Sequence, residues 1–259
     1  MQTIFLAAGW QAAGHGVDWL DRASEIAAWL AAIALGILIV RAIIRHARQP
    51  AVGRLSRGEM DALRAEIAKA ELQTVGEIQV VVLECSDDHP QGDWLAALCT
   101  LLVGAILSSA YFDTAHPSLW LALLLASGAL GFTLARALPD FKRNFVGDKR
   151  AQETVEEQAL QEFARLGVHR TSERSGVLIL VSIFERMAVV LADEGIHSRT
   201  SAATWHDADS AIVAGVQGGS LAEGLRKGIE AVAAVLAEHH PRRGELVNEL
   251  PDHLIVRRK

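Results

Sequence analysis

Three long runs of apolar residues stand out along an otherwise mixed chain. They cover residues 26–44, 94–112 and 118–135, and the last two contain no charged side chain. A helix needs about 20 apolar residues to cross a bilayer, so each run is long enough. The pattern predicts transmembrane helices at residues 23–45, 94–112 and 118–138.

The alternative for each run is a buried helix of a large soluble core. Arg41 makes this alternative stronger for the first run, because its charged group must extend to the membrane surface if the run crosses a bilayer.

The link between the second and third runs is DTAHP, residues 113–117. So short a link predicts an antiparallel hairpin whose two ends return to the same side of the membrane. Lys and Arg follow the first and third runs closely, whereas DTAHP has neither. By the positive-inside rule, residues 1–22 and DTAHP lie outside, and residues 46–93 and 139–259 are cytoplasmic. We therefore expect a multi-pass protein of the inner (cytoplasmic) membrane.

Residues 55–92 and 140–252 show the helix and strand patterns of one α/β domain, followed by a basic C-terminal tail at 253–259. Ser56 and Glu59 form a capping box before a helix. Ser220 and Glu223 repeat it later, and Asp148 is placed to cap another helix.

Three apolar segments, 78–83, 177–184 and 187–193, predict strands. A helical crossover joins the first two, which should therefore be parallel. The third follows a turn at Glu185-Arg186 and should pair antiparallel to the second. The transmembrane hairpin is then an insertion in the loop that leaves the first strand.

Charge and composition exclude several classes of protein. The net charge of −6 gives no basic balance for nucleic acid. Two cysteines, Cys85 and Cys99, make no disulfide framework or CxxC site. The chain contains none of the sequence motifs of common hydrolases or nucleotide-binding loops.

Candidate chemistry therefore depends on acidic residues at the strand ends. Asp87 and Asp88 follow the first strand, whereas Asp193 ends the third strand near Glu77, which opens the first. Oxygen ligands of this kind suit Ca²⁺ or Mg²⁺, although no cofactor is certain. The alternatives are a solvated turn for Asp87-Asp88 and a structural ion pair or cap with Arg174 for the other two.

Other polar residues favour structural roles. Ser182 should be packed inside a strand, and His206-x-x-Asp209 should form a solvated helix face rather than a metal site. The small residues Gly104, Ser108, Gly128 and Gly131 allow helices to approach closely, either inside the hairpin or against a partner.

The chain resembles the TPM domain family in the order and spacing of several segments across roughly residues 55 to 252. These segments are AEIAKAELQTVGEIQVVV (65–82), RSGVLILVSIFERMAVVLADEGIH (174–197), GLRKGIEAV (224–232), EHHP (238–241) and NELPD (248–252). With its hairpin after the first strand, the chain resembles a membrane-embedded bacterial subgroup of this family that has a hairpin at the same place. The additional N-terminal span is less typical of that subgroup.

The resemblance implies an α/β/α sandwich with a mixed sheet, interrupted here by the hairpin. Some plant members are assigned acid phosphatase activity, others assist photosystem assembly, and bacterial members often occur beside LemA-type membrane proteins. The first hypothesis is therefore a non-catalytic interaction and assembly module in a membrane complex, with the bilayer and a LemA-type protein as partners and with oligomers allowed. The second is a divalent-metal-dependent acid phosphatase at the membrane face.

Overall fold

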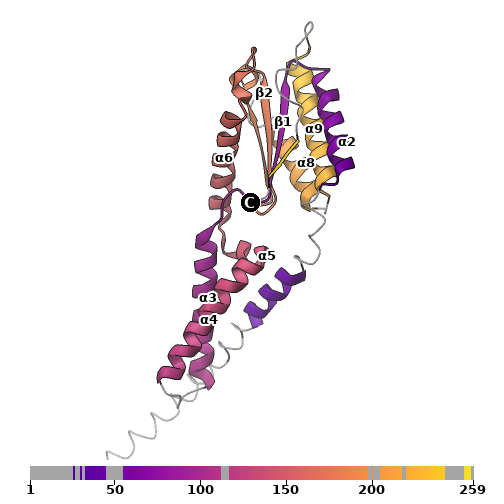
Figure 1. Ribbon diagram of the computed structural model, residues 1–259. Coiled ribbons are helices and arrows are strands. Elements are labelled where there is room, and N and C mark those ends of the chain that lie inside the picture. The colour runs from indigo at the N-terminus through magenta and orange to yellow at the C-terminus, as the bar shows by residue number, and fades with distance from the viewer. Residues whose placement is uncertain are drawn as a thin grey trace, which may run out of the picture. The chain divides into compact units, whose positions relative to one another are not determined.

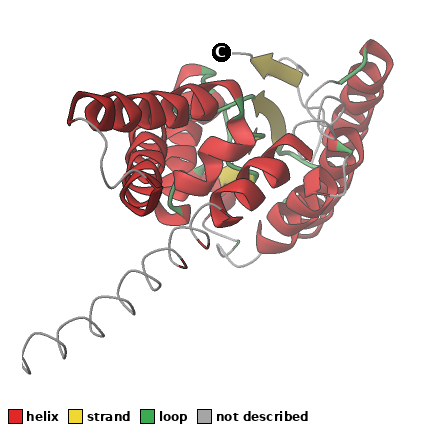
Figure 2. Ribbon diagram, turned by 90° about the horizontal axis from the view of Figure 1, so that it is seen from below, coloured by secondary structure: helices red, strands yellow, loops and turns green. Residues whose placement is uncertain are grey.

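The computed structural model describes residues 26, 30, 33–44, 55–111, 117–197, 200, 205–217, 220–242 and 254–257. The chain divides into two compact units. The helical unit consists of Met1–His46 and His89–Val146, and the sheet unit consists of Ala47–Asp88 and Gly147–Lys259. Helices make up most of the described chain, and the strands are short (Figure 2).

The helical unit contains α3 (Pro90–Tyr111) and α4 (Pro117–Ala137), followed by the short helices α5 (Pro139–Lys142) and η1 (Arg143–Phe145). Among the described residues, α3 and α4 are the helices long and apolar enough to cross a membrane by length and composition. A further apolar helix, Ile33–Ile44, falls in the first predicted span. The rest of that span and most of DTAHP lie outside the described residues.

Small residues hold α3 and α4 together as an antiparallel pair. A Cβ atom on Gly104 would lie 2.7 Å from Ser127 Cβ, and one on Gly131 would lie 2.6 Å from the carbonyl oxygen of Ala96. Contacts this close leave no room for a larger side chain. Gly104 and Gly131 therefore serve packing inside the hairpin.

A buried charge cluster lies where the two helices begin and end. Asp93, in the first turn of α3, is almost completely buried. Its carboxylate lies 3.1 Å from Lys142 Nζ and 3.6 Å from Arg136 Nε. Arg136 also lies over the ring of Phe132, 4.9 Å from its centre. These cations neutralise an acid that would otherwise be costly to bury.

The sheet unit contains β1 (Glu77–Leu83), β2 (Gly176–Ser182), β3 (Met187–Ala192) and β4 (Leu254–Arg257), in the order β3-β2-β1-β4. β1 and β2 are parallel, and β3 is antiparallel to β2. Both orientations confirm the sequence prediction. Every residue of β1 and β2 is buried, as expected for central strands that are covered on both faces.

The prediction of a basic C-terminal tail at 253–259 needs correction, because four of these residues form the strand β4. Leu254–Arg257 pairs in parallel with Val80–Leu83 at the edge of the sheet. The basic composition of the tail concealed a four-residue strand, because LIVR is too short to show an alternating pattern clearly.

Helices cover the sheet on both faces (Figure 1). α6 (Asp148–Arg165) packs on one face. The other face is covered by α2 (Arg57–Glu71), α8 (His206–Gln217) and α9 (Leu221–His239). The unit is thus an α/β/α sandwich with a mixed sheet, and α3 and α4 follow β1 in the chain, before α6.

The structure confirms some of the N-caps that the sequence predicts for the helices. The capping box of Ser56 and Glu59 is complete. Ser220 accepts a hydrogen bond from the backbone N–H of Glu223, whose carboxylate instead accepts hydrogen bonds from Arg226. The expected cap by Asp148 is wrong, because Gly147 occupies the N-cap position and Asp148 begins the helix itself.

Candidate functional site

Two of the predicted acidic residues, Glu77 and Asp193, lie in one row at the end of the sheet where β1 and β2 begin. Glu77 pairs with Gly176 in the parallel ladder, and the backbone N–H of Asp193 donates to the Gly176 carbonyl over 2.9 Å. The pairing places the three residues in one row across the sheet, with glycine in the middle. Alternation along β1 directs Glu77 to the α6 face, where Val81 and Leu83 also pack.

A backbone carbonyl lies over the glycine in this row. A Cβ atom on Gly176 would lie only 2.1 Å from the carbonyl oxygen of Val168, which belongs to the short helix η2 (Val168–Arg170). The absence of a side chain at Gly176 therefore allows this oxygen to approach the sheet. This end of the sheet carries two acidic side chains and one carbonyl, and oxygen ligands of these kinds are the ones that Ca²⁺ and Mg²⁺ prefer.

Asp193 has one carboxylate oxygen without a hydrogen-bond donor. Its Oδ1 accepts the backbone N–H of Glu194 over 2.7 Å, at the start of the short helix α7 (Glu194–His197). Its Oδ2 is buried and has no donor among the described residues. Arg174, which adopts a positive φ of 51°, pairs with Glu194 instead. A buried acceptor left in this state is costly, and a cation would satisfy it.

Asp87 and Asp88 lie at the opposite end of the strands, in the loop that leaves β1. Asp87 is half-buried, and its carbonyl oxygen accepts a hydrogen bond from the Cys85 thiol over 2.6 Å. Asp88 is exposed. Within the described part of the chain, neither belongs to a group of three Asp, Glu, His or Cys side chains whose ligand atoms gather as a metal site requires. Their role as metal ligands stays a prediction.

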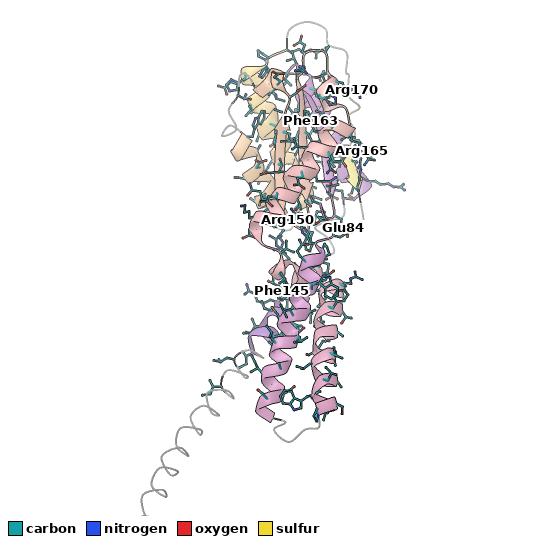
Figure 3. The ribbon with its side chains drawn as sticks, turned by 90° about the vertical axis from the view of Figure 1, so that its left-hand side faces the viewer. Glu84, Phe145, Arg150, Phe163, Arg165 and Arg170 are labelled. Carbon is teal, nitrogen blue, oxygen red and sulfur yellow. The ribbon has the colours of Figure 1, made fainter. Side chains whose placement is uncertain are left out.

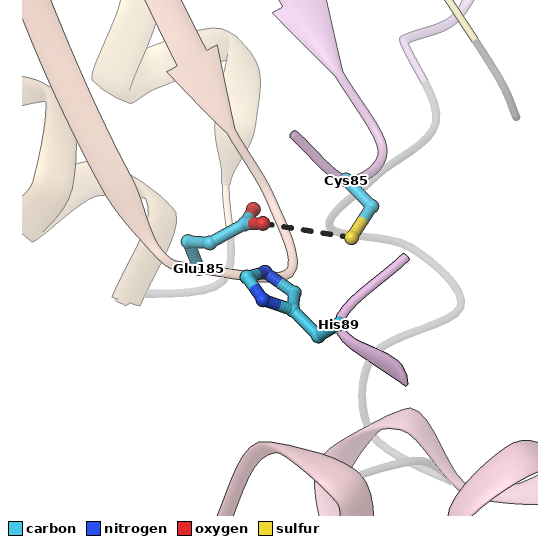
Figure 4. A group of neighbouring side chains, drawn as sticks. All are labelled: Cys85, His89 and Glu185. Atoms are coloured by element: carbon cyan, nitrogen blue, oxygen red, sulfur yellow. Dashed lines mark hydrogen bonds between the residues drawn. The ribbon is translucent and has the colours of Figure 1, made fainter. Parts of the chain in front are cut away.

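The most buried carboxylate at this end is Glu185, which the sequence analysis treated as a turn residue. Only 2% of Glu185 is exposed. It accepts the backbone N–H of Ser86 over 3.1 Å and the hydroxyl of Ser182. The Cys85 thiol also donates to it over 3.5 Å (Figure 4). Figure 4 also draws His89, the first residue of the helical unit.

Strand register explains why these groups converge. Leu83 pairs with Ser182, and the ladder continues as the N–H of Phe184 donates to the carbonyl of Glu84. The next residues of the two segments, Cys85 with Ser86 and Glu185, therefore lie side by side. The inward direction of the Glu185 carboxylate could not be predicted, because it leaves no periodic signal in the sequence. Ser182 is packed as expected and has a hydrogen-bonding role besides.

The other polar candidate is only partly described. Asp209 lies on α8 and is half-buried, whereas the side chain of His206 lies outside the described residues. The pair therefore stays a prediction of a solvated helix face.

Comparison with protein families gives a match that begins just after α5. The profile described as the TPM domain covers residues 144–235, from η1 to most of α9. Over these residues, the resemblance to the TPM domain family is confirmed. The matched residues contain Glu185 and Asp193, whereas Glu77 and the Cys85–Asp88 loop precede them. Membership of the membrane-embedded subgroup stays a prediction.

Among solved structures, the chain is similar to the NMR structure of the BA42 protein from the psychrophilic bacterium Bizionia argentinensis. The sequence identity is 21% and the TM-score is 0.49, over 78% of this chain and 94% of that one. None of the curated proteins compared with the chain matches it.

Proposed function

We propose that this protein is a membrane-anchored TPM-domain module that assembles with another membrane protein. The observation that carries the proposal is the apolar surface of α3 and α4. Their apolar windows are only 28% and 17% buried, whereas a core helix of a soluble protein is buried on most sides. Leu98, Leu102 and Leu125 are each more than half exposed.

Lipid is the environment that fits this surface. Burial of apolar area is favourable by roughly 25 cal/mol per Å², so rows of exposed leucines are unstable in water. Small residues lie where the two helices contact each other, and large apolar side chains are exposed on their other faces. Such a division is typical of helix pairs in membranes.

The finer parts of the proposal follow from charge and from the family resemblance. Basic residues after α4, including Lys142 and Arg143, support a cytoplasmic location for the sheet unit and an inner-membrane location for the helices. The first apolar run would add a third span. A LemA-type protein is the proposed partner, and an assembly with several copies is compatible with it.

Purification in a mild detergent, followed by mass identification of bound proteins, tests the assembly role. We expect the chain to require detergent and to retain a stable membrane-protein partner. Recovery of the chain in the aqueous fraction without detergent would contradict the anchoring. A detergent-soluble chain without any retained partner would contradict the assembly role alone.

Orientation has a separate test. An Ala115→Cys variant, with Cys85 and Cys99 replaced by serine, should react with a membrane-impermeant thiol reagent added outside intact cells. A cysteine appended after Lys259 should react only after the cells are opened. The reverse pattern of labelling would invert the proposed topology.

A divalent-metal-dependent acid phosphatase is the second candidate, and the unsatisfied Oδ2 of Asp193 favours it. This oxygen lies on the sheet edge that also carries Glu77 and the Val168 carbonyl. A metal there would polarise a phosphate oxygen. With para-nitrophenyl phosphate as substrate, the expected result is turnover that requires Ca²⁺ or Mg²⁺ and falls at least tenfold in Asp193→Asn.

Metal binding is measured separately from turnover. Calcium should raise the thermal midpoint of the wild type and leave that of Asp193→Asn unchanged. Glu84→Gln, at an exposed acid at the other end of the strands, is the matched control and should respond as the wild type. Stabilisation without turnover would retain a metal site and reject the enzyme.

A further inference from the structure

The C-terminal strand β4 completes the sheet along the outer edge of β1. Leu254–Arg257 pairs with Val80–Leu83, and the N–H of Glu84 donates to the Arg257 carbonyl over 3.1 Å. Leu254 packs in the core cluster under α2 and α9, and Ile255 packs in the cluster under α6. Without β4, the apolar strand β1 would expose a row of unpaired backbone groups, which is a template for another strand.

A buried ion pair fixes this strand to α6. Glu162 is 1% exposed, and its Oε1 lies 2.5 Å from a guanidinium nitrogen of Arg257. Its Oε2 is buried and has no hydrogen-bond donor among the described residues. Two side chains of α6 also face Glu162: Gln158 donates to its Oε1 over 3.4 Å, and Arg165, which is largely exposed (Figure 3), lies 3.7 Å from it. Arg257 is the nearest cation to Glu162, so the edge strand supplies the closest charge partner of this buried acid.

β4 is the last strand of the sheet and pairs with β1 alone. The ladders that join β1 to β2 and β2 to β3 contain no residue of β4. The preceding anchor is Arg242, whose N–H donates to the Gln73 carbonyl over 3.3 Å. Residues 243–253 connect this anchor to Leu254, a length of chain that spans at most roughly 40 Å.

We propose that the outer edge of β1 is an acceptor site for a strand. Residues 254–257 fill this site within one chain. When β4 leaves it, the same residues of a second copy fill the site instead. The identical segment preserves the register, both apolar contacts and the Arg257–Glu162 ion pair. Exchange of an identical element is a low-cost route to a dimer because no new interface has to arise. The ion pair selects the incoming strand by its arginine.

Two full-length copies with complementary charge changes test this exchange. One copy carries Glu162→Arg and the other carries Arg257→Glu, so each copy alone opposes like charges at the edge. Mixed in detergent, the copies regain opposite charges at both edges by exchanging their C-terminal strands. The expected result is a heterodimer fraction at least tenfold higher in the mixture than the dimer fraction of either copy alone.

The matched control is one chain that carries both changes, Glu162→Arg and Arg257→Glu. It restores the ion pair within the chain and should behave as the wild type. If the mixture contains no excess of heterodimer although both single variants keep the wild-type circular dichroism spectrum, exchange between copies is rejected.

Cross-linking of chains with wild-type charges covers the case in which a charge variant does not fold. Val81 pairs with Ile255 in the ladder, so a Val81→Cys copy should form a disulfide with an Ile255→Cys copy, both having serine at positions 85 and 99. A single chain with both cysteines provides the intramolecular control. A link within that chain and none between copies would overturn the proposal. A link from Val81→Cys to a different membrane protein would assign the site to that partner instead.

Discussion

At the scale of single residues, buried carboxylates that accept hydrogen bonds stabilise the positions of neighbouring strands and loops. Glu185 accepts hydrogen bonds from Ser86 and Ser182 and joins the ends of the two central strands. Hydrogen bonds to a charged acceptor are stronger than those between neutral groups. This network holds the position where the chain leaves the sheet for α3.

Replacement of Glu185 by alanine should destabilise the sheet unit by about 2–4 kcal/mol, because the donors of Ser86 and Ser182 lose their acceptor in a buried place. Glu185→Gln keeps one oxygen acceptor and should cost less. Urea unfolding of the full chain in detergent, followed by circular dichroism, measures both. Glu84→Gln is the control, since Glu84 is the neighbouring exposed acid. Equal midpoints for Glu185→Ala and this control would refute the role of the network.

At the scale of elements, α3 and α4 depend on glycine at particular contacts rather than on glycine in general. A Cβ atom on Gly131 would lie 2.6 Å from the Ala96 carbonyl, whereas one on Gly128 would meet nothing closer than 3.5 Å. The two positions lie in the same helix, so helix propensity affects them alike.

Gly131→Ala should therefore lower the stability of the helix pair by about 1–3 kcal/mol through overpacking. Gly128→Ala should be neutral or slightly stabilising, because alanine favours a helix over glycine. Thermal unfolding in detergent compares the two variants. Equal losses at both positions would show that the hairpin tolerates a wider separation than the structure has.

The cap of α2 makes a prediction about pH. Hydrogen bonds from the Ser56 hydroxyl and backbone lower the pKa of Glu59 below its ordinary value of 4.5. A depressed pKa stabilises the folded state above the unfolded value, and that contribution disappears as the pH falls through the folded value. Ser56→Ala should return the pKa of Glu59 towards 4.5, measured by NMR titration of its carboxylate. An unchanged titration would show that the capping box does not persist in solution.

At the scale of the whole molecule, one folded sheet unit is built from two stretches of chain that flank a helical insertion. β1 comes before α3 and α4, and β2 comes after them, yet the two strands are direct neighbours in the sheet. Surface loops tolerate insertions of this kind because few backbone hydrogen bonds are lost.

A chain made of residues 47–88 and 147–259, joined by a Gly-Ser linker, should fold without detergent. Among the described residues, its two core clusters are built from residues of the sheet unit alone. Size-exclusion chromatography and circular dichroism should show a soluble, folded species with cooperative unfolding. A molten or aggregated product would mean that the sheet unit depends on the inserted helices.

Elements with a strong local or periodic signal could be predicted from the amino-acid sequence alone. Four features have such a local pattern: the apolar runs of α3 and α4, the buried strands β1 and β2, the turn at Glu185-Arg186 and the Ser56 capping box. Strand direction followed from them, because a helical crossover and a tight turn each allow one orientation. The row of Glu77 and Asp193 at one sheet edge followed in turn from strand direction.

The contacts of individual side chains became clear only from the folded protein. Folding turned Glu185 inward, placed the Val168 carbonyl over Gly176, and drew four residues of the C-terminal segment into the sheet against Glu162. These features depend on contacts between residues far apart in the chain. A residue's own neighbours in sequence carry no record of such contacts, because burial and charge pairing arise only when distant segments pack together.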